Sequence, residues 1–160
     1  MAASIFIRIA GIKGESVDQK HKDEIGVLSW GWSVSQSGST GHGGGAGQGK
    51  AAFQDLTFSH QIDKASPLLM KACATGQHLA DAMLTQRRDG TAQHEFLVVK
   101  MTDVIVAAVS NGGSDEGPAT FESVALAFAK ADVEYRPQKS DGSLDAGIHF
   151  RYDLKANKEG

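Results

Sequence analysis

The stretch LSWGWSVS, residues 28–35, gives the clearest indication of the fold. Large apolar and small side chains alternate along it, and a period of two is typical of a β-strand whose two faces meet different surroundings. The apolar set is Leu28, Trp30, Trp32 and Val34, and the small set is Ser29, Gly31, Ser33 and Ser35. We expect the tryptophans to pack in a core. The small side chains then form either a solvent-facing side or a smooth surface for something that passes or docks.

The same alternation recurs along the chain and predicts about seven or eight strands, mostly antiparallel. Turn-forming pairs, such as Asp89-Gly90 and Asp141-Gly142, separate the strands. The other alternating apolar sets are Ile5, Ile7 and Ile9; Leu56, Phe58 and Ile62; Leu97, Val99 and Met101; and Ile148, Phe150, Tyr152 and Leu154. One further run changes phase, because its apolar residues are even-numbered up to Phe128 and odd-numbered from Val133. This change predicts a bulge or a sharp bend near residues 129–132.

Only one segment has the signals of a helix. Ser66 is a plausible N-cap, Pro67 suits the first helical position, and Gly76 suits the stop. We expect the apolar residues between them, including Cys73, to pack on the strands. The fold class predicted is therefore mainly β: a small antiparallel β-barrel of two packed sheets with one short flanking α-helix, in a single domain over residues 1–160.

The totals exclude several classes of protein. A net charge of −3 gives no overall attraction for nucleic acid or for an anionic membrane. The single cysteine, Cys73, excludes an intramolecular disulfide. No apolar run approaches the roughly 18 to 20 residues of a membrane span. The N-terminal MAASIFIRIAG lacks the apolar core of ~7–15 residues that a secretory signal needs.

Residues 40–50, TGHGGGAGQGK, have nearly the spacing of a phosphate-binding loop. Two observations argue against that function. Ala51 stands where a Ser or Thr would hold Mg²⁺, and the next residues alternate as a strand where a helix is required. We expect a flexible strand connector, with a nucleotide-binding enzyme that uses Lys50 as the alternative. The connector is longer than a hairpin requires, which the connector hypothesis alone does not explain.

The other candidate chemical groups predict no active site. The six histidines, at positions 21, 42, 60, 78, 94 and 149, show no His-x-His or His-x-x-x-His pair that could hold zinc. His21 with Asp23 and Glu24 could form an acid–base group, but we expect a solvated loop or a subunit contact. Cys73 is expected to be a buried structural thiol. We therefore expect no catalytic residues, no cofactor and no metal.

Five longer segments resemble the haemolysin-coregulated protein (Hcp) family, the tube protein of type VI secretion systems. The resemblance runs from about Ile5 to Lys158, in order and over essentially the whole chain. The segments are HKDEIGVLSWGWSVSQSG (21–38), FQDLTFSHQIDKASPLLMKACATGQH (53–78), MTDVIVAAVSNGG (101–113), ESVALAFAKADVEYRPQKSDGSL (122–144) and FRYDLKANK (150–158).

The resemblance implies a structural function and no enzymatic one. Family members form homo-hexameric rings that stack into a hollow tube, which a contractile sheath propels into a neighbouring cell. Small effector proteins travel in the ring lumen. The partners implied are further copies of the chain, a VgrG-like spike, sheath proteins and effectors, with no nucleic acid and no membrane. The implied location is the bacterial cytoplasm, followed by secretion without a cleaved signal. A phage-tail-tube-like protein is the alternative of the same class.

The resemblance also assigns functions to two groups of residues. The residue between the tryptophans faces the lumen, so Ser29, Gly31 and Ser33 are the candidate lumen residues; Gly31 stands where a serine is frequent. The long connector projects toward the next ring. The candidate ring-stacking loop is Thr40, Gly41, His42, Gly43, Gly44, Gly45, Ala46, Gly47, Gln48 and Gly49.

Overall fold

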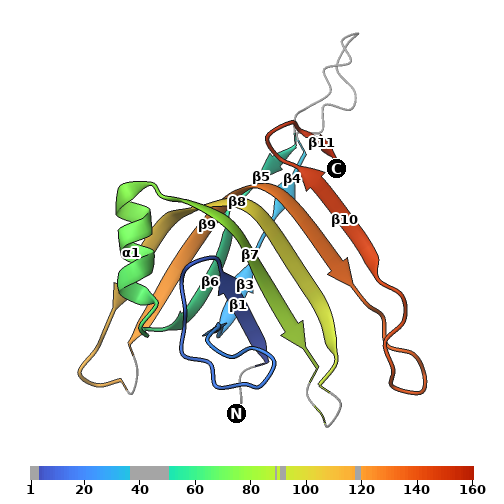
Figure 1. Ribbon diagram of the computed structural model, residues 1–160, viewed down its shortest axis with the longest axis horizontal. Helices are drawn as coiled ribbons and strands as arrows, with labels where there is room; N and C mark the ends of the chain where they lie inside the picture. The colour runs from blue at the N-terminus through green and yellow to red at the C-terminus, as the bar shows by residue number, and fades with distance from the viewer. Residues whose placement is uncertain (1–3, 37–50, 89, 91–92, 118–119) are drawn as a thin grey trace.

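The computed structural model describes residues 4–36, 51–88, 90, 93–117 and 120–160. Within these ranges the chain forms eleven strands and one helix (Figure 1). The strands are β1 (Ile5–Ile9), β2 (Ile25–Gly26), β3 (Ser29–Gly31), β4 (Val34–Ser35), β5 (Ala52–Phe53), β6 (Leu56–Gln61), β7 (His78–Arg87), β8 (Glu95–Gly112), β9 (Phe121–Tyr135), β10 (Ile148–Asp153) and β11 (Lys158–Glu159); the helix is α1 (Ser66–Thr75). The prediction of a mainly β fold with one short helix is confirmed.

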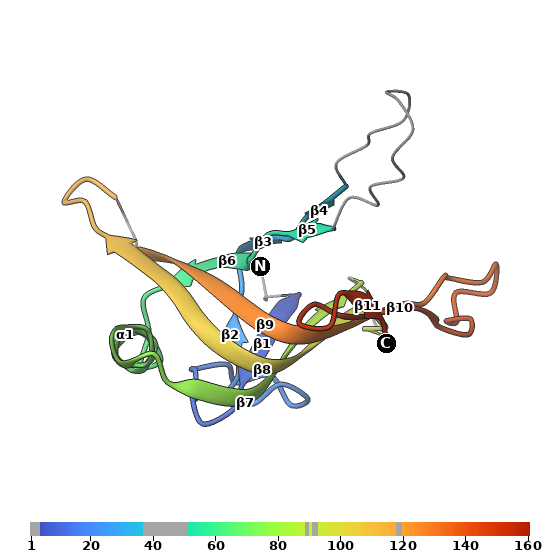
Figure 2. The ribbon, with the colours of Figure 1, turned by 90° about the horizontal axis from the view of Figure 1, so that it is seen from above.

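Nine strands form one curled sheet, and β4 and β5 form a separate two-stranded ribbon (Figure 2). The order in the large sheet is β11-β10-β9-β8-β7-β1-β2, with β6 also paired to β9 and β3 paired to β6. Each strand pairing among the described residues is antiparallel. The prediction of an antiparallel fold in two sheets is confirmed. The predicted barrel needs a correction, because the order of paired strands does not close on itself.

A corner of the chain bridges the opening in the curled sheet. β2 pairs with β1, whereas β3, only three residues later, pairs with β6. Between them the Val27 N–H donates to the Ile5 carbonyl at 2.9 Å, and the Leu28 N–H donates to the Ser59 carbonyl at 2.8 Å. Consecutive residues therefore bond to opposite ends of the sheet, and the sheet encloses a core almost as a barrel does.

The core follows the predicted alternation. Ile7, Leu84 and Leu126 are fully buried inside the curled sheet, and Trp30 and Trp32 pack against them half-buried. Five residues that the alternation placed on packed faces are instead exposed: Leu28, Val34, Ile62, Ile148 and Phe150. Alternation predicts which face of a strand a residue lies on, but not whether a second layer covers that face.

The predicted bend in β9 is real, and three strands share it. In β8 the buried side chains change from odd to even positions between Met101 and Val104, and in β9 they change from Phe128 to Ala131. β7 changes in the same row. At the centre of this row Asp103 has a φ of 58°, in the left-handed region that non-glycine residues rarely adopt. This backbone conformation turns the sheet over its own core (Figure 2).

The change of phase also allowed a bulge near residues 129–132, but the irregularities in strand pairing lie at other positions. Register shifts occur between Val106 and Ala108 in β8 and between Gln86 and Arg87 in β7. The β8–β9 register runs unchanged through residues 130–135 of β9. The phase change in β9 is therefore a bend without an inserted residue.

The helix begins differently from the prediction. Ala65 is the N-cap residue and provides no side-chain cap, whereas Ser66 lies inside the helix and is buried. The Ser66 hydroxyl instead accepts a hydrogen bond from the Asp63 N–H at 3.1 Å, so it closes the preceding turn. The predicted stop is confirmed, since Gly76 ends the helix in the left-handed region at φ 64°. Cys73 packs against the core, but it is half-buried and not fully buried.

Candidate functional site

The three predicted lumen residues lie on one accessible side of the sheet. Ser29 and Gly31 are exposed on β3, and Ser33 is exposed just after it. The Ser29 hydroxyl lies 2.6 Å from the Ser59 hydroxyl of β6, and the Thr57 hydroxyl reaches the Gly31 carbonyl at 3.5 Å. The strand with the two tryptophans therefore presents small polar groups outward, as expected from its alternation.

This side continues across four strands in two rows of small residues. Paired residues on neighbouring antiparallel strands point to the same face of a sheet, so each row can be followed through the register. One row is Ser29, Ser59, Ser123 and Ser110, and the other is Gly31, Thr57, Ala125 and Ala108, in the order β3-β6-β9-β8. We call these eight residues the small-residue face. Sequence reasoning missed six of them, because alternation within one strand does not tell which strands are neighbours.

Gly31 is not required by the backbone at its position. A Cβ atom built there would meet only the Thr57 hydroxyl, at 3.9 Å. A serine would fit without displacing anything. Glycine at this position therefore flattens the face and removes one hydroxyl, without relieving a local clash.

Trp30 and Trp32 lie on the other side of this sheet and pack against the core. The Trp30 indole N–H donates to the Gln86 side-chain oxygen at 3.1 Å, and the Trp32 indole N–H donates to the Gln54 carbonyl at 2.8 Å. Each ring thus buries its apolar body while its N–H finds an acceptor. These bonds fix β3 and the start of the ribbon, and so fix the direction of the small-residue face.

The small-residue face ends at two unpaired strand edges. On one side β3 pairs with β6, and on its other side it has no strand partner among the described residues. At the far side, residues 106–112 of β8 pair with β9 and with no other described strand, since the pairing of β7 with β8 stops at Ile105. Unpaired edges carry free N–H and C=O groups and are ready to pair with another chain.

His21 is a correction to the prediction of a solvated histidine. It is 4% exposed, its ring stacks on Phe6 at 4.5 Å, and its two ring nitrogens lie 2.8 Å from Glu24 and 2.7 Å from Glu95. Asp23, which was grouped with it, does not join this network. The arrangement ties the loop before β2 to the start of β8, so it stabilises the fold and has no access for a substrate.

Arg87 donates a hydrogen bond to Asp18, and its guanidinium carbon lies over the Phe6 ring, 4.8 Å from the ring centroid. The bond from Arg87 holds the pKa of Asp18 well below its usual range, at about 2. No local pattern predicts this pair, because its members are 69 positions apart in the chain.

A second buried network lies where β6, β9 and β8 meet. His60 and Glu122 are both buried, with Nε2 of the ring 2.8 Å from Glu122 Oε1. The Asn111 amide donates to the other Glu122 oxygen at 3.1 Å. Burial raises the pKa of nearby Asp63, against the opposing effect of a hydrogen bond from the Ala65 N–H. This network joins three strands that carry the small-residue face.

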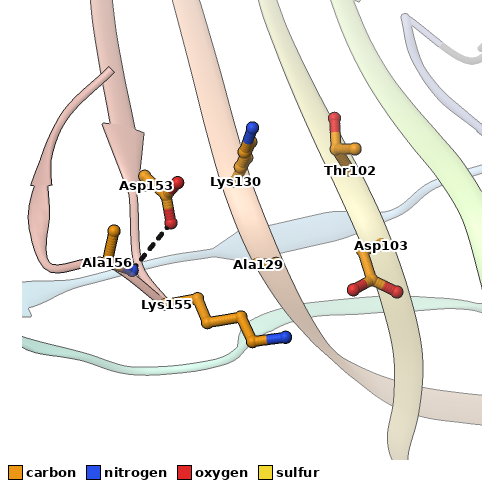
Figure 3. A pocket seen from close by; sticks show the side chains of 7 residues that line it. All are labelled: Thr102, Asp103, Ala129, Lys130, Asp153, Lys155 and Ala156. Atoms are coloured by element: carbon orange, nitrogen blue, oxygen red, sulfur yellow. Dashed lines mark hydrogen bonds between the residues drawn. The ribbon is translucent and has the colours of Figure 1, made fainter.

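A shallow pocket of about 300 Å³ lies outside the sheet at the bend (Figure 3). It lies between β8, β9 and the turn after β10, and Asp153 in its wall accepts a hydrogen bond from the Ala156 N–H. Its lining residues are Thr102, Asp103, Ala129, Lys130, Asp153, Lys155 and Ala156. Two lysines and two aspartates offset each other, and the lining holds no nucleophile beside a base. The pocket therefore gives no basis for catalysis.

No group of three or more His, Cys, Asp or Glu side chains that could hold a metal occurs in the described part of the chain. The candidate stacking loop, residues 40–49, and Lys50 lie outside the described residues. Among the residues that the structure describes, no helix is long and apolar enough to cross a membrane.

Comparison with known proteins decides the family. The family model described as "Type VI secretion system effector, Hcp" matches residues 6–135. The chain belongs to the Hcp family. Protein hcp1 of Pseudomonas aeruginosa is 45% identical over 159 residues, which cover 98% of each chain. Hcp is a family of structural proteins of the type VI secretion system, and the resemblance noted from the sequence is confirmed.

Solved structures of Hcp proteins match nearly the whole chain. The crystal structure of Hcp1 from Salmonella typhimurium is 44% identical, covers 99% of each chain and has a TM-score of 0.81. A structure described as that of a type six secretion system protein is 27% identical, covers 99% of this chain and 100% of its own, and has a TM-score of 0.91. The predicted Hcp-like β fold is therefore confirmed.

Proposed function

We propose that this Hcp protein is the tube subunit of a type VI secretion system: it forms hexameric rings, the rings stack into a hollow tube, and the tube is secreted with effectors in its lumen. The observation that carries the proposal is the small-residue face bounded by two unpaired strand edges. A closed ring needs a surface for the lumen and two different edges that join neighbouring subunits. The four-strand sheet supplies all three.

The directions of the strands favour an edge-to-edge contact. β3 is antiparallel to β6, which is antiparallel to β9, so β3 and β9 run in the same direction. β8 pairs directly with β9 and runs antiparallel to it. When β3 of one subunit lies beside residues 106–112 of β8 in the next, the two strands are antiparallel. The alternation of directions then continues from subunit to subunit. A contact between two different surfaces of this kind closes into a ring when the rotation is suitable.

The small-residue face suits the lumen. Its serine and threonine hydroxyls can each donate one hydrogen bond and accept others. In a wall of six subunits they would form a polar lining with few large side chains. Such a lining can bind the polar surface of a folded effector through many weak contacts, and it has no deep pocket that would prevent release. This supports Ser29, Gly31 and Ser33 as lumen residues and adds Thr57, Ser59, Ser110 and Ser123.

Stacking is assigned to residues 40–49. In the sequence this segment stands between the two strands of the β4–β5 ribbon. The ribbon packs against β10, since the rings of Phe53 and Tyr152 have centroids 4.8 Å apart. The assignment makes the excess length of the connector useful for contact with the next ring. The sheath, a VgrG-like spike and small effectors are the further partners that this function requires.

Native mass spectrometry of the purified protein tests the ring. The expected species has six times the 16.9 kDa mass of the chain. Electron microscopy of the same sample should show annular particles with a central hole. A protein that stays monomeric at tens of micromolar would contradict the proposal.

A further inference from the structure

The segment before β2 covers one face of the sheet. Phe6 of β1 is 2% exposed and its paired neighbour Thr85 of β7 is 1% exposed, on the face of the sheet opposite Ile7. The ring of His21 stacks on the Phe6 ring, with centroids 4.5 Å apart and planes 7° apart. Residues 14–24, which we call the lid, therefore shield a small second core from water.

The lid has a defined fold of its own. The Gly14 N–H donates to the Asp23 carbonyl at 2.7 Å, and the Ser16 N–H donates to the Glu24 carbonyl at 3.0 Å. The Asp23 N–H returns a bond to the Ser16 carbonyl at 2.9 Å. These bonds are internal to the lid, so they do not attach it to the sheet. Side-chain bonds attach it to the rest of the protein: Glu15 to the Lys64 N–H, Asp18 to Arg87, and His21 to Glu95.

The bond from His21 differs from the other two, because both ring nitrogens face a carboxylate. Nδ1 lies 2.8 Å from Glu24 Oε2 within the lid, and Nε2 lies 2.7 Å from Glu95 Oε1 at the start of β8. A neutral imidazole has one N–H, and its other nitrogen carries only a lone pair. A hydrogen bond at both nitrogens therefore requires one proton more than a neutral histidine and two carboxylates hold. We call these three residues the clamp, and the additional proton belongs to the clamp as a whole.

The charges around the clamp do not replace this proton. Glu24 Oε1 is buried without a hydrogen-bond partner among the described residues, so the charge of Glu24 depends on the imidazole beside it. Asp18 accepts the His21 backbone N–H at 3.3 Å, and it also accepts a hydrogen bond from Arg87 of β7. Asp18 and Arg87 thus offset each other, and β1 contributes only the uncharged ring of Phe6. The remaining charged side chains of the lid are at least partly exposed to water: Glu15, Lys20, Lys22 and Asp23.

We propose that the proton shared by His21, Glu24 and Glu95 holds the lid closed, so that the lid opens more readily as the pH rises. The closed lid binds one proton more than the open lid, in which the three side chains meet water separately. A rise in pH favours the state with fewer bound protons, and the opening equilibrium constant rises roughly tenfold per pH unit wherever only the closed lid keeps this proton. This device goes beyond the tube function, and it operates in a monomer and in a ring alike.

His60 shows what the clamp has in addition. Its Nε2 lies 2.8 Å from Glu122, but its Nδ1 lies 3.8 Å from Asp63, which is too far for a hydrogen bond. A neutral ring with its hydrogen on Nε2 satisfies this arrangement. His60 therefore needs no additional proton, although it is as deeply buried as His21.

His149 has two carboxylate neighbours, but it holds no lid. It contacts Asp132 at 2.8 Å and Glu134 at 2.9 Å, and its side chain is 30% exposed. Arg151 also contacts Asp132 at 3.2 Å, and Lys100 stands opposite Asp132 on β8. These groups lie on strands that already share backbone pairing, so loss of a proton there leaves the strands in place.

Proteolysis of the purified full chain tests the inference. Trypsin can cut after Lys20 and Lys22, but cleavage requires the lid to open first, so its rate reports the open fraction. The rate is measured by mass spectrometry between pH 7 and 9, relative to a synthetic peptide of residues 14–28 under the same conditions. In the wild type this relative rate should rise with pH, by up to about tenfold per unit.

Glu95→Gln is the decisive variant. The glutamine amide can donate to a neutral His21 ring while the ring donates to Glu24, so the clamp no longer needs its additional proton. The relative cleavage rate of this variant should not change with pH. Glu159→Gln, at an exposed position in β11, removes the same charge elsewhere and should behave as the wild type does.

Two results would overturn the inference: a relative rate in the wild type that does not depend on pH, or an equal rise with pH in Glu95→Gln. Nitrogen-15 spectra of the histidine rings provide a second measurement, which does not depend on how well Glu95→Gln folds. The signal that disappears in His21→Gln should show two protonated nitrogens in the wild type at pH 7, and one unprotonated nitrogen would contradict the clamp. Native mass spectrometry of the same samples reports the ring separately, so a failure of the ring function leaves this test unaffected.

Discussion

Ser29 on β3 and Ser59 on β6 face each other across the strand pair, with their hydroxyl oxygens 2.6 Å apart. The same row continues through Ser123 and Ser110 on β9 and β8. Four serines from four strands thus form one line across the sheet, although they are spread over residues 29–123 of the chain. This row determines what a molecule in the lumen would meet.

A bulky residue in this row should affect cargo and leave the ring intact. Ser29→Trp projects from the exposed side of β3, away from the core. We expect hexamers at the wild-type mass and a loss of effector co-purification of at least tenfold. Val17→Trp, on an exposed loop, is the control for added aromatic surface. Equal effector recovery from the two variants would show that the small-residue face does not line the lumen.

Two glycine substitutions should differ strongly in their effect on stability. Gly31→Ser should change the free energy of unfolding by less than about 0.5 kcal/mol, since the new Cβ would meet only the Thr57 hydroxyl at 3.9 Å. Gly14→Ser should destabilise by roughly 1–3 kcal/mol or more, because its Cβ would lie 2.5 Å from the Glu24 carbonyl oxygen. Urea denaturation of both variants measures the difference. Similar values for the two would mean that the backbone around Gly14 adapts freely.

The buried network around Glu122 should contribute more to stability than an exposed ion pair. Glu122→Ala leaves His60 and Asn111 without their shared partner inside the protein, and should cost about 3–5 kcal/mol. Asp81→Ala removes an ion pair with Arg8 that is about half exposed, and should cost less than about 1 kcal/mol. Chemical denaturation near neutral pH compares the two variants. A loss below 1 kcal/mol for Glu122→Ala would exclude a structural function for this network.

The Asp18–Arg87 bond should stabilise the protein in a defined range of pH. Arg87 lowers the pKa of Asp18 to about 2 from an ordinary value of 3.8. The folded state therefore favours the charged carboxylate, and the contribution is complete above about pH 4 and lost as the pH falls to about 2. Asp18→Asn should be less stable than the wild type between pH 5 and 7, and the difference should shrink across that acidic range. Asp55→Asn, at an exposed position, is the control; a pH-independent difference for Asp18→Asn would refute the assignment.

The prediction from sequence succeeded where a property repeats along one strand or helix. Alternation placed Trp30 and Trp32 against the core, and the change of phase after Phe128 located a bend. It failed where the result depends on a distant residue. His21 was expected in solvent, but Glu95, 74 positions away, provides its second partner. Ser66 was expected to cap the helix, but its hydroxyl accepts a hydrogen bond from the Asp63 N–H in the preceding turn.

The sequence by itself determined the mainly β character, the position of the helix, the family and the small outward side of β3. These follow from local periodicity and from the order of recognisable segments, both of which are written along the chain. Only the tertiary structure decided which strands are neighbours, and therefore which serines form the row beside Ser29. It also decided that His21 and His60 are buried, that the bend passes through Asp103, and that Met70 and Phe150 remain exposed. The physical reason is that strand pairing, burial and uncovered surface depend on contacts between residues far apart in the sequence, which no local pattern contains.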